Sequence, residues 1–363
     1  MDGSRNAACL ARLFPDGTVD TSFVAGNSAS GASISGTVST LAVDSVGRVV
    51  IGGPFTTYGN ISRAGIARLE SNGTIDGGFV VTNAITSGVL ALAVQTNDAV
   101  VIGGTFNYGN YGPSWNVRLN PDGTMDTSFA SYPNGAVYAV AIQPDGRILI
   151  GGTFTTVNGA PRYRIARLNG DGSLDTTFQY NMAGCSGTVR CIEVQTDGKI
   201  LIGGDFTSVN YATRYYVARL NTDGSLDTNF NNSYSGGPNG SVYAVAEQAN
   251  GCVLIGGNFS EIGYAAMSRV ARLYTDGTRD TSFTNSWINS TVESLAIQND
   301  GRVLIGGTFT SVNFTNNVSY LARLYGDLYP PQFVTQPGGN ANLYDGSANG
   351  GSRGGNRFLG RDD

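Results

Sequence analysis

The sequence contains no histidine, and Lys199 is the only lysine among its 22 basic residues. The absence of histidine excludes His-ligated zinc sites and both Ser-His-Asp and Cys-His catalysis. The other basic residues are arginines, whose planar guanidinium groups suit hydrogen-bonded ion pairs within a fold. With a net charge of -5, we expect no nucleic-acid partner, because nucleic-acid binding usually requires a basic face.

Cysteine and long apolar runs are also scarce. The four cysteines are too few and too irregularly spaced for a disulfide framework: Cys9, Cys185, Cys191 and Cys252. Cys185 and Cys191 are near enough for a local bridge in an oxidising compartment, with free thiols as the alternative. No run of eighteen apolar residues occurs, so we expect no membrane insertion. The segment from Met1 to Arg5 does not show the apolar core of a secretion signal.

Glycine is abundant instead, at 52 of 363 residues, and much of it recurs in a fixed pattern. A Gly-Gly pair preceded by Ile recurs six times, at spacings of 51, 48, 52, 53 and 50 residues. A period of this size predicts a propeller or another array of supersecondary units within one domain. The pairs are Gly52-Gly53, Gly103-Gly104, Gly151-Gly152, Gly203-Gly204, Gly256-Gly257 and Gly306-Gly307.

Each repeat reads as four β-strands, which in the third copy are Val137 to Gln143, Arg147 to Phe154, Arg164 to Asn169 and Ser173 to Phe178. The first two strands are apolar on both faces, as expected of strands that are covered on both sides. In a propeller the neighbouring blades provide that cover, whereas a sandwich would show a cleaner alternation of apolar and polar residues. The Gly-Gly pair that ends the second strand allows another backbone to approach closely. We therefore predict an all-β propeller of four-stranded antiparallel blades.

The turns within each repeat set the register of the outer strands. Pro121-Asp122-Gly123 matches a three-residue hairpin loop with a glycine bulge, and in that register Arg118 lies opposite Asp126. We predict one structural cross-strand ion pair per blade, each contributing about 0.2–1 kcal/mol if exposed. The pairs are Arg12/Asp20, Arg68/Asp76, Arg118/Asp126, Arg167/Asp175, Arg219/Asp227 and Arg272/Asp280.

Two phrases carry a family resemblance: ARLNGDGSLDTTF at Ala166 to Phe178 and IEVQTDGKILIGGDFT at Ile192 to Thr207. They resemble the bacterial delta-60 repeat, and the likeness extends over roughly residues 9 to 330. The resemblance implies a β-propeller found in long extracellular or envelope-associated proteins, with no established activity. We accordingly expect an extracellular or cell-surface location, or a place in a virion.

The two ends of the chain bear on the number of blades. The third-strand signature occurs seven times, from Leu13 to Leu324, against six copies of the first two strands. We predict seven blades, in which the stretch from Gln336 to Gly346, a weak echo of the repeat, supplies inner strands to the blade begun by Cys9 to Phe23. Six blades with a spare outer strand are the alternative.

We divide the chain into propeller repeats at residues 1–330 and a Gly/Asn-rich tail at residues 331–363. The tail would complete the last blade or contact a neighbouring subunit. The phrase from Pro330 to Pro337 also resembles the start of an immunoglobulin-like module, which would weaken the seven-blade prediction.

Positions that vary within the constant repeat are the candidates for binding. The second residue of the first strand is in turn Ser39, Leu90, Tyr138, Arg190, Tyr243 and Glu293. We predict a polar ligand site formed by Tyr138, Arg190, Tyr243 and Glu293, with simple filling of the channel as the alternative. The variable connections 179–187 and 231–240 are rich in Asn, Ser, Gly and Tyr and would suit glycans, or would be plain solvated loops.

Two further patterns have alternative interpretations, one as a calcium loop and one as a catalytic carboxylate pair. The segment from Asn169 to Asp175 resembles part of a calcium loop but lacks the distal bidentate Glu, so a hairpin turn is the structural interpretation. Glu193, Glu247 and Glu293 lie on or near the first strands, which leaves open a carboxylate pair. We expect no catalytic residue, cofactor or metal.

The sequence thus predicts a non-enzymatic interaction or structural module of an extracellular, envelope or virion-type assembly, with protein subunits or a surface glycan as partners. The alternative is a hydrolase or lyase acting on a glycan, with Glu193, Glu247 or Glu293 working beside Arg190 in the channel.

Overall fold

The computed structural model describes residues 10–24, 34–82, 85–86, 88–108, 113–179, 182–230, 236–283, 287–313, 315–316 and 319–324. All regular elements within these residues are β-strands. In the same ranges, no helix is long and apolar enough to cross a membrane. The chain is therefore all-β wherever the structure describes it.

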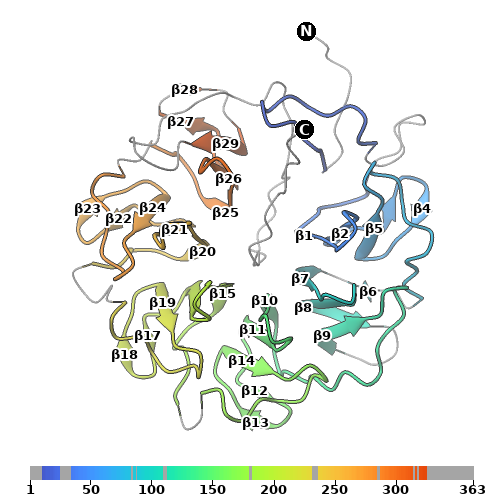
Figure 1. Cartoon of the computed structure of the whole chain (residues 1–363), viewed down its shortest axis with the longest axis horizontal. Helices are drawn as coiled ribbons and strands as arrows, with labels where there is room; N and C mark the ends of the chain where they lie inside the picture. The colour runs from blue at the N-terminus through green and yellow to red at the C-terminus, as the bar shows by residue number, and fades with distance from the viewer. Residues whose placement is uncertain are drawn as a thin grey trace.

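Six antiparallel sheets follow one another along the chain and around a common centre (Figure 1). In the third sheet, β10 (Val137–Ile142) pairs with β11 (Ile148–Gly152), which pairs with β14 (Ile165–Leu168). We number the sheets along the chain as units one to six. Unit one consists of β1 (Thr40–Val43), β2 (Val49–Gly52) and β5 (Ile66–Leu69), and unit two of β7 (Val89–Val94), β8 (Val100–Tyr108) and β9 (Pro113–Leu119). Unit four consists of β15 (Val189–Val194), β16 (Ile200–Gly204) and β19 (Val217–Leu220), unit five of β20 (Val242–Glu247), β21 (Val253–Gly257) and β24 (Val270–Leu273), and unit six of β25 (Val292–Ile297), β26 (Val303–Gly307) and β29 (Leu321–Leu324).

The fourth strand of units one to five is shorter than predicted. In the third unit it pairs through a single bridge, Leu168 with Leu174, instead of running from Ser173 to Phe178. The reason is local: the carboxylate of Asp175 accepts hydrogen bonds from the backbone N–H of Thr177 at 2.9 Å and from its hydroxyl at 2.6 Å. Such side-chain bonds to the nearby backbone compete with strand pairing, so the chain bends away from the sheet.

Short two-stranded ribbons, which the sequence analysis did not predict, lie in the connection between the second and third strands. They are β3 (Thr57–Tyr58) with β4 (Ile61–Ser62), β12 (Thr156–Val157) with β13 (Ala160–Pro161), β17 (Ser208–Val209) with β18 (Ala212–Thr213), β22 (Glu261–Ile262) with β23 (Ala265–Ala266), and β27 (Ser311–Val312) with β28 (Thr315–Asn316). In the second unit, β8 instead continues outward and also pairs with β6 (Ile85–Thr86). The ribbons lie at the outer edge of the molecule (Figure 1).

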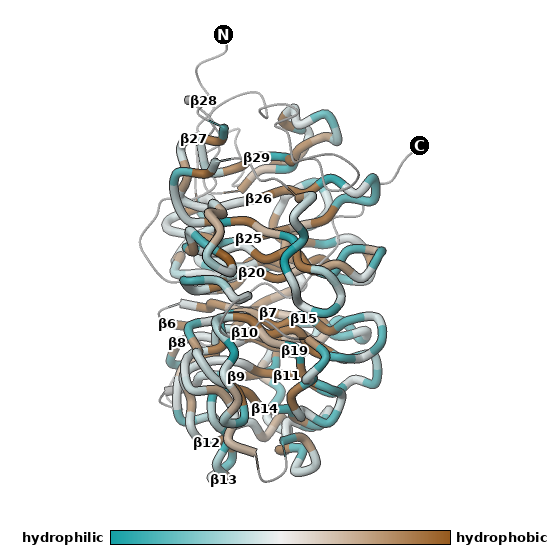
Figure 2. Tube along the Cα trace, turned by 90° about the vertical axis from the view of Figure 1, so that its left-hand side faces the viewer, coloured by the Kyte–Doolittle hydropathy of each residue, from teal (hydrophilic) through white to brown (hydrophobic). Residues whose placement is uncertain are grey.

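The core lies between successive sheets, where the inner strands β1, β7, β10, β15, β20 and β25 contact one another in chain order. Figure 2 shows the hydrophobic strands in the middle of the molecule and hydrophilic turns along its faces. In units one to five, the first glycine of the pair allows the next unit to pack closely: a Cβ on Gly151 would lie 2.6 Å from Cγ1 of Val189. The second glycine is equally confined, because a Cβ on Gly152 would collide with the carbonyl oxygen of Ala136.

The structure forms an ion pair at each of the six predicted Arg/Asp positions, with N···O distances of 2.6 to 2.8 Å. In the third unit, Nε of Arg167 donates to Oδ2 of Asp175 at 2.8 Å, and the guanidinium lies 4.7 Å from the ring centroid of Phe178. Nη1 of Arg167 also donates to the carbonyl of Thr222 in the next unit, at 2.5 Å. Each of these arginines therefore joins outer segments within a unit, and several also join neighbouring units.

The N-terminal hairpin, residues 10–24, continues this pattern at both ends of the array. Arg12 pairs with Asp20 and donates to the carbonyl of Ser71 in the first unit. Arg323 of the sixth unit donates to the carbonyl of Pro15, the position in the hairpin that matches Thr222. The hairpin thus contacts both the first and the sixth unit. A complete seventh blade stays a prediction, because Cys9, the stretch 336–346 and the tail 331–363 lie outside the described residues.

Candidate functional site

In units two to six, the variable second residue of the inner strand occupies a β-bulge. The pairing of β15 with β16 shifts register between Val189 and Cys191, so Arg190 is the extra residue. Similar shifts between the inner strand and its partner make Tyr138, Tyr243, Glu293 and Leu90 the extra residues of β10, β20, β25 and β7. A bulge re-aims a side chain out of the regular alternation, which frees this position from the demands of the core.

Arg190 is the centre of a cluster that joins three successive units. Its guanidinium carbon lies 5.5 Å from the ring centroid of Tyr138 and 5.3 Å from that of Tyr243. Its Nε donates to both carboxylate oxygens of Asp205, at 2.8 and 2.9 Å. Burial lowers the pKa of Arg190, but the hydrogen bond and charge of Asp205 outweigh it, so the pKa is raised and the group stays cationic.

The structure brings together three of the four predicted ligand residues. Glu293 occupies the equivalent bulge one unit beyond Tyr243 and takes no part in the three contacts that define the cluster. Among the described residues, Nη1 and Nη2 of Arg190 have no hydrogen-bond partner, and the side chain is 21% exposed. The terminal fork of the guanidinium is therefore available to a planar oxyanion such as a carboxylate.

Asp205 and Asn258 also belong to the cluster, although neither was among the predicted ligand residues. Nδ2 of Asn258 donates to the hydroxyl of Tyr243 at 3.3 Å. Asp205 makes the equivalent contact one unit earlier, where it accepts a hydrogen bond from Arg190. Both residues directly follow a Gly-Gly pair, a position that varies from unit to unit just as the bulge does. The same search for variable positions within the constant repeat would have found them.

Among the acidic residues considered for catalysis, Glu247 has both carboxylate oxygens in hydrogen bonds. Oε1 of Glu247 accepts a hydrogen bond from the amide of Gln195 at 2.7 Å, and Oε2 accepts one from the backbone of Thr196 at 3.0 Å. These bonds fasten the end of β20 to a turn of the preceding unit. No group of three or more Cys, Asp or Glu side chains that could hold a metal occurs in the described ranges.

The calcium-like segment and the cysteines also have structural roles. Asp171 accepts from the backbone N–H of Ser173 at 2.9 Å and from its hydroxyl at 2.6 Å, and Gly172 has a φ of +84°. The segment therefore builds a hairpin turn. Cys185 and Cys191 are free and buried rather than bridged, and burial raises the pKa of Cys185 to about 12.

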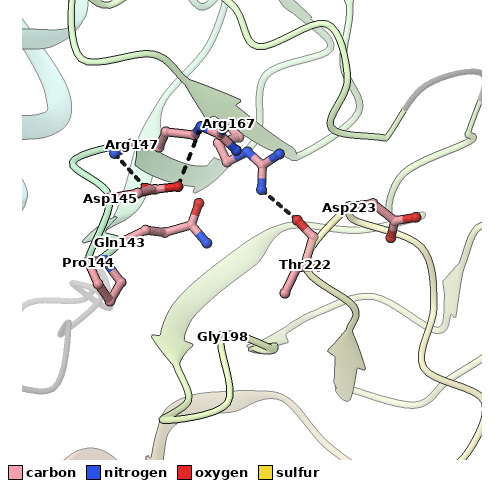
Figure 3. A pocket seen from close by; sticks show the side chains of 8 residues that line it. All are labelled: Gln143, Pro144, Asp145, Arg147, Arg167, Gly198, Thr222 and Asp223. Carbon is pink, nitrogen blue, oxygen red and sulfur yellow. Dashed lines mark hydrogen bonds and ion pairs between the residues drawn. The ribbon is translucent and has the colours of Figure 1, made fainter.

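A shallow hollow of about 380 Å³ lies between the third and fourth units, at the turns opposite the Arg190 bulge (Figure 3). Its charged residues already have partners: Arg147 lies 3.5 Å from Asp145 and 3.7 Å from Asp175. Arg167 crosses to the carbonyl of Thr222. These contacts hold two units together, so we place the candidate site at the Arg190 cluster.

Six repeated antiparallel sheets, with inner strands in mutual contact, define a β-propeller. The chain belongs to the β-propeller family described as a domain of unknown function (DUF5122). The family pattern matches seven segments: residues 1–23, 47–79, 95–129, 143–178, 195–230, 248–283 and 298–327. No curated protein matches the sequence.

Solved structures show likeness at the level of the fold. Virginiamycin B lyase from Staphylococcus aureus is 13% identical with a TM-score of 0.47, over 82% of this chain and 85% of the enzyme. The extracellular domain of the hybrid two-component system BT3049 from B. thetaiotaomicron is 14% identical with a TM-score of 0.47, over 80% of this chain. The match spans only 39% of that domain. PorZ, a surface component of the type-IX secretion system of Porphyromonas gingivalis, is 14% identical with a TM-score of 0.46, over 84% of this chain and 43% of PorZ. Likeness this distant supports no functional inference.

Proposed function

We propose that this propeller is a non-enzymatic interaction module of an extracellular, envelope or virion-type assembly, built from repeats of the delta-60 type. Its ligand carries a carboxylate, supplied by a protein partner or by an acidic glycan, and binds at the Arg190 cluster. The observation that carries the proposal is the open terminal fork of Arg190 between the rings of Tyr138 and Tyr243.

The constant and the variable residues of the repeat have different roles, and this difference supports the proposal. The constant residues are used in packing and ion pairs, as the contacts of Gly151 and Arg167 show. The variable bulge residues are not part of that constant framework, and two of them, Tyr138 and Tyr243, lie against the guanidinium of a third, Arg190. Tyr and Arg are the side chains that most often anchor binding surfaces. An Arg held by one carboxylate while its fork is open is preorganised for a second one.

The test is calorimetric titration with pairs of ligands that differ only in the carboxylate. One pair is a tri-galacturonide and the corresponding neutral galactose trisaccharide, and the other is a peptide with a free or an amidated C-terminus. We expect the acidic member of one pair to bind, and Arg190→Gln to weaken that binding by roughly tenfold or more, since a charge-assisted bidentate bond is lost. Arg302→Gln is the matched control, because Arg302 is partly exposed and pairs locally with Asp300 at 3.2 Å.

Two results would overturn the proposal. The first is equal affinity of wild type and Arg190→Gln for both acidic ligands. The second is conversion of the galacturonide into shorter or unsaturated products, detected by mass spectrometry, which would favour the glycan hydrolase or lyase alternative.

A further inference from the structure

The tips of the ribbons at the outer edge of units three to six contact the loop that precedes the inner strand. Residue Asn158 in the first turn position donates its N–H to the carbonyl of Tyr132 at 3.1 Å, and Tyr132 donates to Oδ1 of Asn158 at 2.8 Å. Both bonds recur between Asn210 and Gly184 and between Asn313 and Trp287. Gly263 forms only the backbone bond, to the carbonyl of Gly237. Each ribbon tip therefore consists of a turn residue and a loop residue that are hydrogen-bonded to each other.

Each of these four tips has an exposed aromatic residue, which belongs to the loop in two units and to the turn in the other two. The loop supplies it in units three and six, as Tyr132 and Trp287. In units four and five the loop residue is glycine, and the second turn residue is instead Tyr211 or Tyr264. We call these four residues the rim aromatics; they are 69%, 92%, 75% and 44% exposed for Tyr132, Tyr211, Tyr264 and Trp287. Repetition of one consensus sequence does not explain an aromatic residue that occurs at the loop position in two units and at the second turn position in two others.

Two of the rim aromatics occupy an unfavourable backbone conformation. Tyr211 has a φ of +67° and Tyr264 a φ of +63°, at the turn position where the third unit has Gly159 with a φ of +78°. Glycine is preferred there, because a bulky residue in the left-handed region is strained. Neither tyrosine forms a hydrogen bond or ring contact with the described residues, so packing does not compensate for the strain. Strain without a folding benefit is a reason to look for a function.

The chemistry of the tips indicates the kind of ligand. The four ribbon segments, 156–161, 208–213, 261–266 and 311–316, contain Glu261 as their only charged residue and are otherwise polar or apolar. The rings are on separate tips that succeed one another around the edge (Figure 1), rather than clustered as the anchors of a protein interface are. An aromatic face suits the C–H face of a sugar, while neighbouring Asn and Ser groups suit its hydroxyls.

We propose that the rim aromatics bind an uncharged glycan chain that lies along the outer edge, with successive rings stacked on sugar units. This deepens the proposed interaction function, but at a second site that does not use Arg190. A repeating polymer fits a row of equivalent contacts, because several weak stacking contacts along one chain reinforce each other.

The experiment is calorimetric titration of the full chain with neutral cello-, chito- and malto-oligosaccharides. The double variant Tyr211→Gly, Tyr264→Gly removes both rings and restores the residue that the turn prefers. We expect at least one oligosaccharide to bind, and the glycine variant to bind it roughly tenfold more weakly, which is about the loss of one to two stacking contacts. The melting temperature of this variant should be equal to or higher than that of wild type. The matched control, Tyr211→Phe, Tyr264→Phe, should bind like wild type.

The outcomes also separate this proposal from that of the Arg190 cluster. Arg190→Gln should leave binding of the neutral oligosaccharide unchanged, so either site can fail alone. The rim proposal is wrong if none of the oligosaccharides binds, if the glycine variant binds as well as wild type, or if that variant melts at a lower temperature. Loss of a protein ligand in the glycine variant, without glycan binding by wild type, would assign the rim to a protein partner instead.

Discussion

The aspartate of the fourth segment holds the outer part of a unit together, because it pairs with the arginine of the third strand and accepts hydrogen bonds from the residue two positions later. Burial raises the pKa of Asp175, but hydrogen bonds from the side chain and backbone of Thr177 and from Arg167 outweigh that effect and lower the pKa to about 2. Burial likewise raises the pKa of Asp280, and bonds from Ser282, Tyr274 and Arg272 lower it to about 2. The pKa is also lowered at the four equivalent positions, Asp20, Asp76, Asp126 and Asp227.

These lowered pKa values predict acid sensitivity. A carboxylate whose pKa is lower in the folded state stabilises the fold above its unfolded pKa, near 4, and this contribution is lost as the pH falls toward 2. We expect Asp175 and Asp280 to contribute about 2 kcal/mol each to the free energy of unfolding at neutral pH. Urea unfolding between pH 6 and pH 2 should show a steep loss of stability below about pH 4.

Asp175→Asn provides the control for this prediction. The variant should be less stable than wild type at pH 6, and the difference should shrink as the pH approaches 2, because wild type then loses the same charge. A difference that stays constant with pH would show that the charge of Asp175 does not carry the effect.

At the scale of the element, the Gly-Gly pair determines how closely the second strand approaches both the next unit and the rest of its own unit. Gly152→Ala would force a methyl group into the carbonyl of Ala136, and we expect a loss of about 3 kcal/mol or failure to fold. Gly170→Ala is the matched control, since a Cβ at this exposed turn residue meets no atom within 4 Å and should change stability by less than about 0.5 kcal/mol. Equal stability of the two variants, measured by urea unfolding, would contradict the packing argument.

The elements themselves were predicted unevenly. The first three strands of a repeat were placed within two residues of their observed ends, as for β10 (Val137–Ile142), because apolar runs between turn signals are strong local patterns. The fourth strand was overestimated because the bonds of Asp175 to Thr177 end the pairing early. The ribbons were missed because strands of two residues carry little periodicity, and an Asn-Gly signal marks the turn only at Asn158-Gly159.

At the scale of the whole molecule, the N-terminal hairpin and the sixth unit are joined by the bond from Arg323 to Pro15. The seven-blade prediction assigns the inner strands beside that hairpin to the C-terminal region. Removing residues 325–363 should then expose apolar faces of the first and sixth units and lower the melting temperature by about 5 °C or more, equivalent to roughly 2 kcal/mol.

A shorter deletion, of residues 347–363, is the control, because it retains the stretch 336–346 that echoes the repeat. It should melt closer to wild type than the longer deletion in differential scanning calorimetry. An unchanged melting temperature after removal of residues 325–363 would favour the six-blade alternative.

The sequence by itself determined the all-β class, the order of the repeated units and the arginine and aspartate positions that pair, because these follow from local periodicity and turn chemistry repeated along the chain. Only the tertiary structure decided that Arg190 lies between Tyr138 and Tyr243 and is held by Asp205, because these residues belong to three different units. It also decided that the rim aromatics occupy equivalent tips. Contacts between units depend on how sheets pack around a common centre, and no pattern within one repeat contains that information.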